Sequence, residues 1–296
     1  MPRGLPFVLW ATLLVSLAVA AAPSPTPSPA DAARAQGAQL LAKGEFEAAA
    51  ESLEQALELA PDDAEAHHLL GAAYGIQAAN GGAFTGMRLV GRVKEHFERA
   101  VALVPDSIDY RRSLLQFYAA VPAIGGGGMA KARLQAAEIA KRDAVEGELA
   151  YAIIAAADDD PEEAHRRLSL AYAQRPDDQR IGVQLGLVLQ QQERYDEAFV
   201  HFQAMTARDA GAMSAWYQLG RTSVLAKQRL VEGEAAFKRY LAHQPKDSEP
   251  PLAAAHWRLG MLYELMKDLG QARTQYQAAL ALDPEHDEAK AALKKL

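Results

Sequence analysis

The chain has 296 residues, half of them hydrophobic, with no cysteine and a formal net charge of −7. The lack of cysteine excludes disulfides, thiolate catalysis and cysteine-based zinc sites. The acidic charge gives no electrostatic footprint for nucleic acid, so no nucleic-acid partner is expected, and anionic membrane surfaces are poor partners.

Residues 1–22 have the organisation of an export signal. Arg3 supplies a positive start, and the apolar run that follows is "LPFVLWATLLVSLAVA". Its last three residues, "AVA", are the small-residue pattern that a signal peptidase accepts. An uncleaved anchor is the alternative, but the apolar run is shorter than the roughly 20 residues that a membrane span needs. We expect cleavage, and therefore a periplasmic or secreted protein with no membrane span.

Residues 23–30, "PSPTPSPA", form a stiff proline-rich linker with nothing to pack. Beyond it, two distant segments share one skeleton, "FEAAAESLEQALELAPDDAEA" and "LGQARTQYQAALALDPEHDEA". Each has an alanine, then a large residue, a second alanine and a proline at the same spacing. These are Ala49, Leu53, Ala56 and Pro61 in the first segment, and Ala272, Tyr276, Ala279 and Pro284 in the second.

The shared skeleton resembles the tetratricopeptide repeat (TPR), a helix–turn–helix unit of 34 residues. The resemblance implies an all-α fold, a TPR α-solenoid in which the units stack into a right-handed superhelix. Residues 31–296 hold seven units, near 30–63, 64–107 with an insertion, 108–144, 145–178, 179–212, 213–247 and 253–286, followed by a short C-terminal helix. A generic alanine-rich bundle is the alternative, and agreement across most of the chain disfavours it.

The spacing has a physical explanation in helix packing. Glycines such as Gly186 and Gly220 fall on the first helix of a unit, and alanines such as Ala198 fall on the second. Small residues let two helix axes approach to about 8–10 Å, and aromatic residues fill the space to the next pair. Leu115 replaces the glycine in unit three, which departs from the pattern.

The glycine run in "VPAIGGGGMAKA", residues 121–132, is tested first as a phosphate-binding loop. Such a loop needs glycine directly before its lysine and a hydroxyl residue after it, but Lys131 lies between two alanines. We therefore expect a lengthened, mobile hinge between the helices of unit three. The surrounding "FYxxxPxxxGG" pattern is similar to exported bacterial TPR proteins without a clear assigned activity. Its residues are Phe117, Tyr118, Pro122, Gly126 and Gly127.

No other motif indicates catalysis, a metal or a cofactor. "DDDPEEAH" from residue 158 could be a cation loop, but a helix start explains it better, with Asp160 as N-cap, Pro161 next and Glu163 closing a capping box. The eight histidines form no His-Glu-x-x-His motif, and Ser214 lacks a base partner. The chain is therefore predicted not to be an enzyme.

The sequence is best explained as a non-catalytic binding scaffold. The TPR resemblance implies a protein or peptide partner in the concave groove, which the first helices line. In the TPR register the groove residues are Tyr217, Gln218, Arg221, Trp257, Arg258, Met261, His68, Arg112, Gln116 and Gln184. The family's lysine and asparagine clamp for a peptide's terminal carboxylate is missing, which argues against a chaperone-tail partner. Aromatic residues with arginine, as found here, are enriched at binding hot spots.

Three alternatives remain open from the sequence. Trp257 could pack into the junction with unit six instead of facing the groove. A small-ligand or catalytic role could be built on the inserted loops of units two and three. The protein could also be a structural component of an envelope complex, held through its convex face.

The export signal gives the first prediction. Signal peptidase should cleave the chain between Ala20 and Ala22, because the small residues of "AVA" follow the apolar run directly. Sequencing the N-terminus of the mature protein checks this. Recovery of intact Met1 in the membrane fraction would contradict it.

Overall fold

The computed structural model describes residues 27–246 and 249–296, so the predicted signal peptide lies outside the described residues. The described part contains fifteen α-helices, one short 3-10 helix and no strand. The helices are α1 Pro29–Lys43, α2 Phe46–Leu59, α3 Ala64–Asn80, α4 Gly82–Leu103, α5 Ile108–Ala120, α6 Met129–Arg142, α7 Ala144–Ala157, α8 Pro161–Gln174, α9 Gln179–Gln191, α10 Tyr195–Arg208, α11 Met213–Ala226, α12 Leu230–Leu241, α13 Leu252–Leu265, α14 Leu269–Leu282 and α15 Asp287–Lys295. The 3-10 helix η1 spans Ala123–Gly125.

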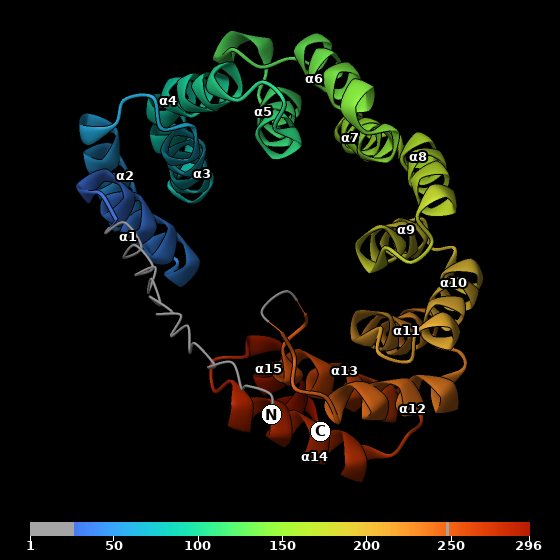
Figure 1. Ribbon diagram of the computed structural model, residues 1–296. Helices are drawn as coiled ribbons and strands as arrows, with labels where there is room; N and C mark the ends of the chain where they lie inside the picture. Colours follow the sequence, from blue (N-terminus) through green and yellow to red (C-terminus); the bar gives the residue numbers. More distant parts are fainter. Residues whose placement is uncertain (1–26, 247–248) are drawn as a thin grey trace, which may run out of the picture.

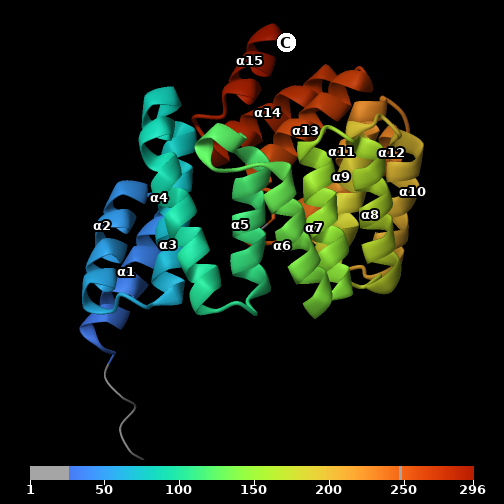
Figure 2. The ribbon, with the colours of Figure 1, turned by 90° about the horizontal axis from the view of Figure 1, so that it is seen from above.

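The helices pack in consecutive antiparallel pairs, and the pairs stack into an open ring (Figure 1). The first helices of units two to six, α3, α5, α7, α9 and α11, line the inside of the ring. Their partners α4, α6, α8, α10 and α12 form the outside. Seen from above, the pairs stand side by side around the turn, and α15 follows the last of them (Figure 2). The prediction of an all-α TPR solenoid is confirmed.

Side-chain caps set where several helices begin. The hydroxyl of Ser28 and the carboxylate of Asp31 form a capping box, so α1 begins at Pro29, inside the segment that the sequence assigned to the linker. Asp160 is the N-cap of α8 as predicted, and its carboxylate accepts from the backbone N–H of Glu163. The predicted capping box is wrong, because the Glu163 carboxylate instead binds Arg166 and Arg167.

In units one, two, five, six and seven, a glycine of the first helix meets a large side chain of the second. A methyl group built on Gly71 would lie 2.7 Å from the Phe97 ring, and one on Gly260 would lie 2.5 Å from the Tyr276 ring. At Gly186 it would overlap the ring of Phe202. The two helices therefore pack closely only because the glycine has no side chain.

In unit three the large residue is on the first helix and the small residue is on the second. Leu115 takes the place of the glycine, and Ala136 takes the place of the large residue on the second helix. Both are fully buried and belong to one hydrophobic cluster. The departure seen in the sequence is therefore compensated within the same unit.

The insertion of unit two is helical, so the expected inserted loop is not found there. It lengthens α3 to 17 residues and α4 to 22, separated only by Gly81. The glycine run of unit three forms a hydrogen-bonded turn. The N–H groups of Gly125, Gly126, Gly127 and Gly128 all donate to backbone carbonyls, the last to Tyr118 at 2.7 Å.

The close contact at Gly186 gives a stability prediction. Gly186→Ala and Ala198→Leu should each lower the free energy of unfolding by about 1–3 kcal/mol, because both overpack the contact between α9 and α10. Gly91→Ala is the matched control, since a methyl group there meets nothing within 4 Å. It should raise the stability by about 0.5–1 kcal/mol, the usual gain for alanine in a helix. Chemical denaturation measures all three, and equal effects would contradict this packing.

Candidate functional site

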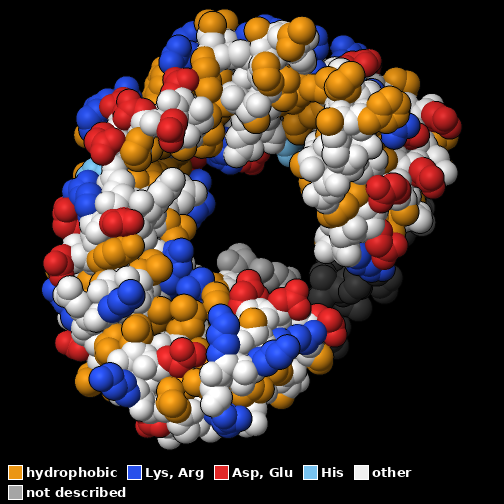
Figure 3. Space-filling model, turned by 180° about the vertical axis from the view of Figure 1, so that it is seen from behind, with side chains coloured by type: hydrophobic (Ala, Val, Ile, Leu, Met, Phe, Trp, Pro, Cys, Tyr) orange, Lys and Arg blue, Asp and Glu red, His pale blue; other side chains and the backbone are white. Residues whose placement is uncertain are grey.

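Two arginines on the inner helices α11 and α13 form the centre of the candidate site. Arg221 and Arg258 come from adjacent units and lie close enough for the charge of Arg258 to affect Arg221. Neither has a carboxylate within ion-pair distance among the described residues. Figure 3 shows the ring from behind, with lysine and arginine side chains on the wall of its central opening.

Arg221 is held by neutral groups. Its guanidinium donates to the side-chain oxygen of Gln190, which is 4% exposed, and makes a longer contact of 3.4 Å with the Gln218 side chain. The Gln190 amide is fixed in turn by the Thr222 hydroxyl at 2.7 Å. Burial and then the charge of Arg258 lower the pKa of Arg221. A positive charge is thus kept in a partly buried place by hydrogen bonds alone.

Arg258 is held by an aromatic frame. Its Nε donates to the hydroxyl of Tyr217 at 2.9 Å, and its guanidinium carbon lies 4.8 Å from the centre of the Trp257 ring. The terminal nitrogens of Arg258 make no hydrogen bond to the described residues. They are the donors that remain available for a ligand.

Trp257 packs against a hydrophobic cluster whose members come from both unit six and unit seven. Its indole is half-buried and faces the ring of His286, 5.3 Å away between centres, where α15 begins. His286, at the start of α15, therefore packs against the same indole that the Arg258 guanidinium contacts. Met261, one turn further along α13, packs half-buried in the same cluster.

Tyr217 and Gln218 lie beneath the groove surface, with exposed fractions of 5% and 8%. The Tyr217 ring packs edge-on against Tyr240, and its hydroxyl points to Arg258. The Gln218 carbonyl accepts from Thr222. The structure therefore brings Tyr217, Gln218, Arg221, Trp257 and Arg258 together, with the first two positioning the arginines from below.

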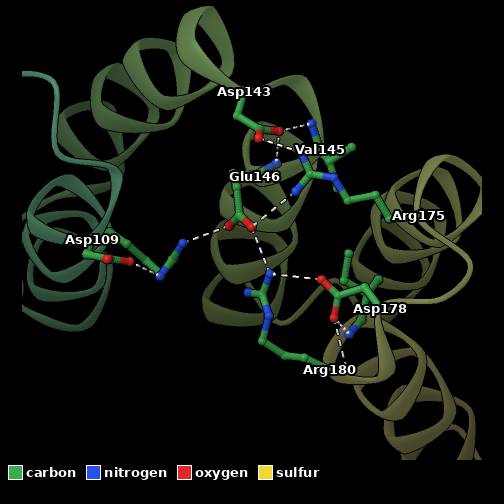
Figure 4. A network of polar contacts seen from close by, with 9 residues as sticks. Asp109, Asp143, Val145, Glu146, Arg175, Asp178 and Arg180 are labelled. Carbon is green, nitrogen blue, oxygen red and sulfur yellow. Dashed lines mark hydrogen bonds and ion pairs between the residues drawn. The ribbon is translucent and has the colours of Figure 1, made fainter. Parts of the chain in front are cut away.

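Arg112 belongs to a different arrangement, a carboxylate network on the middle units (Figure 4). Glu146 of α7, whose side chain is 11% exposed, accepts from Arg112 of α5 and Arg180 of α9, both at 2.7 Å. Arg175 lies 3.7 Å away and also pairs with Asp143. The network joins three successive units and neutralises their arginines.

A similar pairing occurs at the first units, where Arg34 of α1 binds Asp63, the N-cap of α3, and Glu65 of α3. Arg34, Arg112 and Arg180 on the inner helices are thus matched by carboxylates. Arg221 and Arg258 differ from them in being matched by amides and a phenol. The two arginines of units six and seven thus have neutral groups as their described hydrogen-bond partners.

The remaining predicted groove residues are spread over units two, three and five. His68 bonds the Ser113 hydroxyl at 2.8 Å, and burial lowers the pKa of its imidazole. Gln116 is exposed and lines an apolar groove between α3, α4 and α5. Gln184 of α9 is exposed. These residues do not join the arginine pair.

The apolar groove is a feature that sequence reasoning missed. It has a volume of about 670 Å³ and is lined mainly by small and apolar residues of the lengthened helices and of η1. Met87 and Ile124 on its wall are 77% and 99% exposed, and Phe84 nearby is 81% exposed. Apolar residues in an insertion that the repeat core does not need were the available signal. Gln190 was also missed, and its signal was a polar residue at a buried helix position.

The described residues contain neither a cluster suited to a metal ion nor a helix suited to span a membrane. No group of three or more histidine, aspartate and glutamate side chains there could hold a metal ion. Within residues 27–246 and 249–296, no helix combines the length and the apolar character that crossing a membrane requires.

Comparison with known families identifies the repeat. Residues 37–77 match the family described as TPR repeat, and residues 253–286 match the family described as tetratricopeptide repeat. The chain contains tetratricopeptide repeats. Among curated proteins, none matches the sequence.

Solved structures with the same architecture are distant in sequence. A tetratricopeptide repeat protein from Parabacteroides merdae is 13% identical with a TM-score of 0.53, covering 90% of this chain and 98% of its own. Human IFIT1, solved as a dimer with m7Gppp-AAAA, is 19% identical with a TM-score of 0.58, covering 90% and 62%. PilW, described as a type IV pilus biogenesis factor, is 16% identical with a TM-score of 0.50, covering 90% and 100%. At these identities the likeness shows the TPR fold alone.

The Glu146 network gives a second stability prediction. Glu146→Gln should lower the free energy of unfolding by about 1–2 kcal/mol, because it leaves arginines of three units without their shared anion while water screens part of the effect. The matched control is Asp196→Asn, which removes one exposed pair with Arg229 and should change little. Urea denaturation of both variants checks this, and equal losses would contradict a central role for Glu146.

Proposed function

We propose that this protein is a non-catalytic scaffold that binds a protein or peptide partner in its concave groove, outside the cytoplasm. The centre of the groove is formed by Tyr217, Arg221, Trp257 and Arg258. The observation that carries this proposal is the pair of inner-face arginines whose charge no described carboxylate matches, set beside a half-buried indole.

The composition of this centre supports macromolecular recognition. Arginine and tryptophan are enriched at binding hot spots because they combine a large apolar area with several hydrogen-bond donors. The buried partners Gln190 and Tyr217 fix both arginines before a ligand arrives, which lowers the entropy that binding loses. The resemblance to TPR proteins supports a partner on this same face. The extracytoplasmic location depends on the export signal.

The similar structures suggest different partners and do not decide between them. PilW is described as a pilus biogenesis factor, and IFIT1 is solved with a capped oligonucleotide. The net charge of −7 favours a protein or peptide over nucleic acid for this chain.

A second candidate function comes from the apolar groove of units two and three. Its walls are apolar, and Ser113 and Gln116 are its polar side chains. It contains no pair of acid–base groups, so a catalytic role there has no support. The groove suits an apolar small ligand or an apolar side chain of the partner.

The proposed groove is tested by crosslinking in the native cells. The double variant Trp257→Ala, Arg258→Gln should weaken capture of a specific partner at least tenfold, because it removes the indole and a charged donor from the groove. A lower melting temperature is expected, because Trp257 packs on His286 and Arg258 bonds the Tyr217 hydroxyl, so capture is compared at a temperature at which circular dichroism shows both proteins folded. Arg221 is less suitable, because its removal would leave the buried Gln190 oxygen without a donor, at about 1–3 kcal/mol.

The control variant is Arg133→Gln on the outer helix α6, where the arginine forms an exposed pair with Asp158. This change should leave capture unaltered. Unchanged capture in the double variant, with the protein folded, would overturn the groove assignment.

A further inference from the structure

We infer that the apolar groove between α3, α4 and α5 binds the hydrocarbon chain of a single-chain lipid that has an uncharged polar head. The inference rests on the second candidate function, because it names the ligand of that groove. It does not involve the arginine pair of units six and seven. The shape of the apolar groove, its lining and its two ends all favour this occupant.

The apolar groove lies where two inner helices stand apart. The inner helices α5 and α7 pack directly on each other, as do α11 and α13, whereas α3 and α5 make no comparable contact. Val93 and Phe97 of α4 line the space between α3 and α5, and η1 lines one end of it. The residues that face the space from α3 and α5 include Gly75, Ala79 and Ala120, whose small size leaves it open.

The apolar groove is long and narrow. Its lining on α4 extends from Gly86 to Phe97, which is about 16 Å at the helical rise per residue. A volume of about 670 Å³ over that length gives a mean cross-section of about 40 Å². An α-helix with its side chains is about 10–12 Å across, so its cross-section is about twice this area or more. The space therefore fits a linear chain better than a helix of a partner.

The lining disfavours an extended peptide. None of the described residues that line the apolar groove is charged, and Ser113 and Gln116 are its polar side chains. An extended peptide carries a backbone N–H and C=O at each residue, and burying these groups without hydrogen-bond partners is costly. A hydrocarbon chain has no such groups, and its transfer from water to an apolar lining is favourable.

One end of the apolar groove is polar and uncharged. Ser113 and Gln116 lie one turn apart on α5, and the Ser113 hydroxyl is 2.8 Å from Nε2 of His68. Burial lowers the pKa of His68, so its imidazole is neutral at neutral pH. Arg112, which precedes Ser113, is already paired with carboxylates. Gln116 is exposed, so its amide is open to a hydroxyl or ester head of the ligand.

The other end opens on an apolar edge of the ring. Met87 and Ile124 on the wall and Phe84 nearby have the highest exposed fractions of all large hydrophobic residues that the structure describes. Figure 2 shows the adjoining ends of α3 and α4 rising above α1 and α2. Exposed apolar side chains at this end extend the surface that a hydrocarbon chain contacts.

Binding is tested on the mature full chain with N-phenyl-1-naphthylamine, a neutral dye whose fluorescence rises in apolar sites. Monolaurin, an alkyl chain on a glycerol head, should displace the dye saturably below its aggregation concentration. Laurate should displace it at least fivefold more weakly, because the apolar groove offers no charge to a carboxylate, and glycerol should not displace it. Where the dye itself does not bind, calorimetric titration with monolaurin measures the affinity directly.

Ala79→Phe and Ala120→Phe each place a ring in the apolar groove at an exposed position. Both proteins should stay folded and bind monolaurin at least tenfold more weakly. The matched control is Ala204→Phe, which adds the same ring at an exposed position of the outer helix α10 and should leave binding unchanged. Gln116→Leu should weaken monolaurin binding about three- to tenfold, the usual effect of one hydrogen bond, and leave the affinity for the dye unchanged.

The inference is overturned if monolaurin does not bind, if laurate binds as tightly, or if Ala204→Phe weakens binding as much as Ala120→Phe. It is also overturned if Ala120→Phe abolishes partner capture, or cosedimentation with phosphatidylcholine vesicles, while no alkyl ligand binds. The apolar groove would then contact a protein or a membrane. Partner capture that depends on Trp257 and Arg258 tests the proposed function separately, so either conclusion can fail without the other.

Discussion

The close contact between a glycine on the first helix and a large side chain on the second is the constraint on which the rest of the structure depends. At Gly71, Gly186, Gly220 and Gly260 there is no room for a methyl group, because an aromatic ring occupies that space. The contact sets how closely the helices of one unit approach, and thereby which side chains face the ring interior. Unit three shows that the requirement is one small and one large residue, since Leu115 and Ala136 exchange the roles.

The inner face of the ring has two kinds of arginine: those paired with carboxylates and those held by uncharged groups. The carboxylate of Glu146 pairs with arginines from three units. The carboxylates of Asp63 and Glu65 pair with Arg34. These pairs hold neighbouring units together and leave little charge for a ligand. Arg221 and Arg258 are instead supported by uncharged groups. Arginine thus pairs with carboxylates in the middle of the array and with neutral groups near its C-terminal end.

The sequence predicted the fold well, because each repeat places small, large and helix-ending residues at fixed spacing. It also predicted that Tyr217, Arg221, Trp257 and Arg258 would come together, since the TPR register fixes the face of each helix position. It did not predict the depth of each side chain. Register alone does not show that Tyr217 is covered by Tyr240, or that His286 supports Trp257 from the next element.

The insertions were harder to predict because they have no register. Glycine-rich sequence indicated loops, yet the insertion of unit two continues two helices, and the glycine run forms a turn with every N–H bonded. Backbone hydrogen bonds over several residues decided these conformations, and the composition of a short segment does not reveal them.

The stacking of neighbouring units has a mechanical consequence. Substantial helix contacts run between consecutive pairs around the ring, so the two ends are related only through the junctions between them. A small rotation at each junction adds to the next, and the diameter of the opening can change while every glycine contact stays intact. The width of the opening can therefore change while the packing of the two helices within each unit stays the same. A partner that touches both the arginine pair and the apolar groove of units two and three would set the width of the ring.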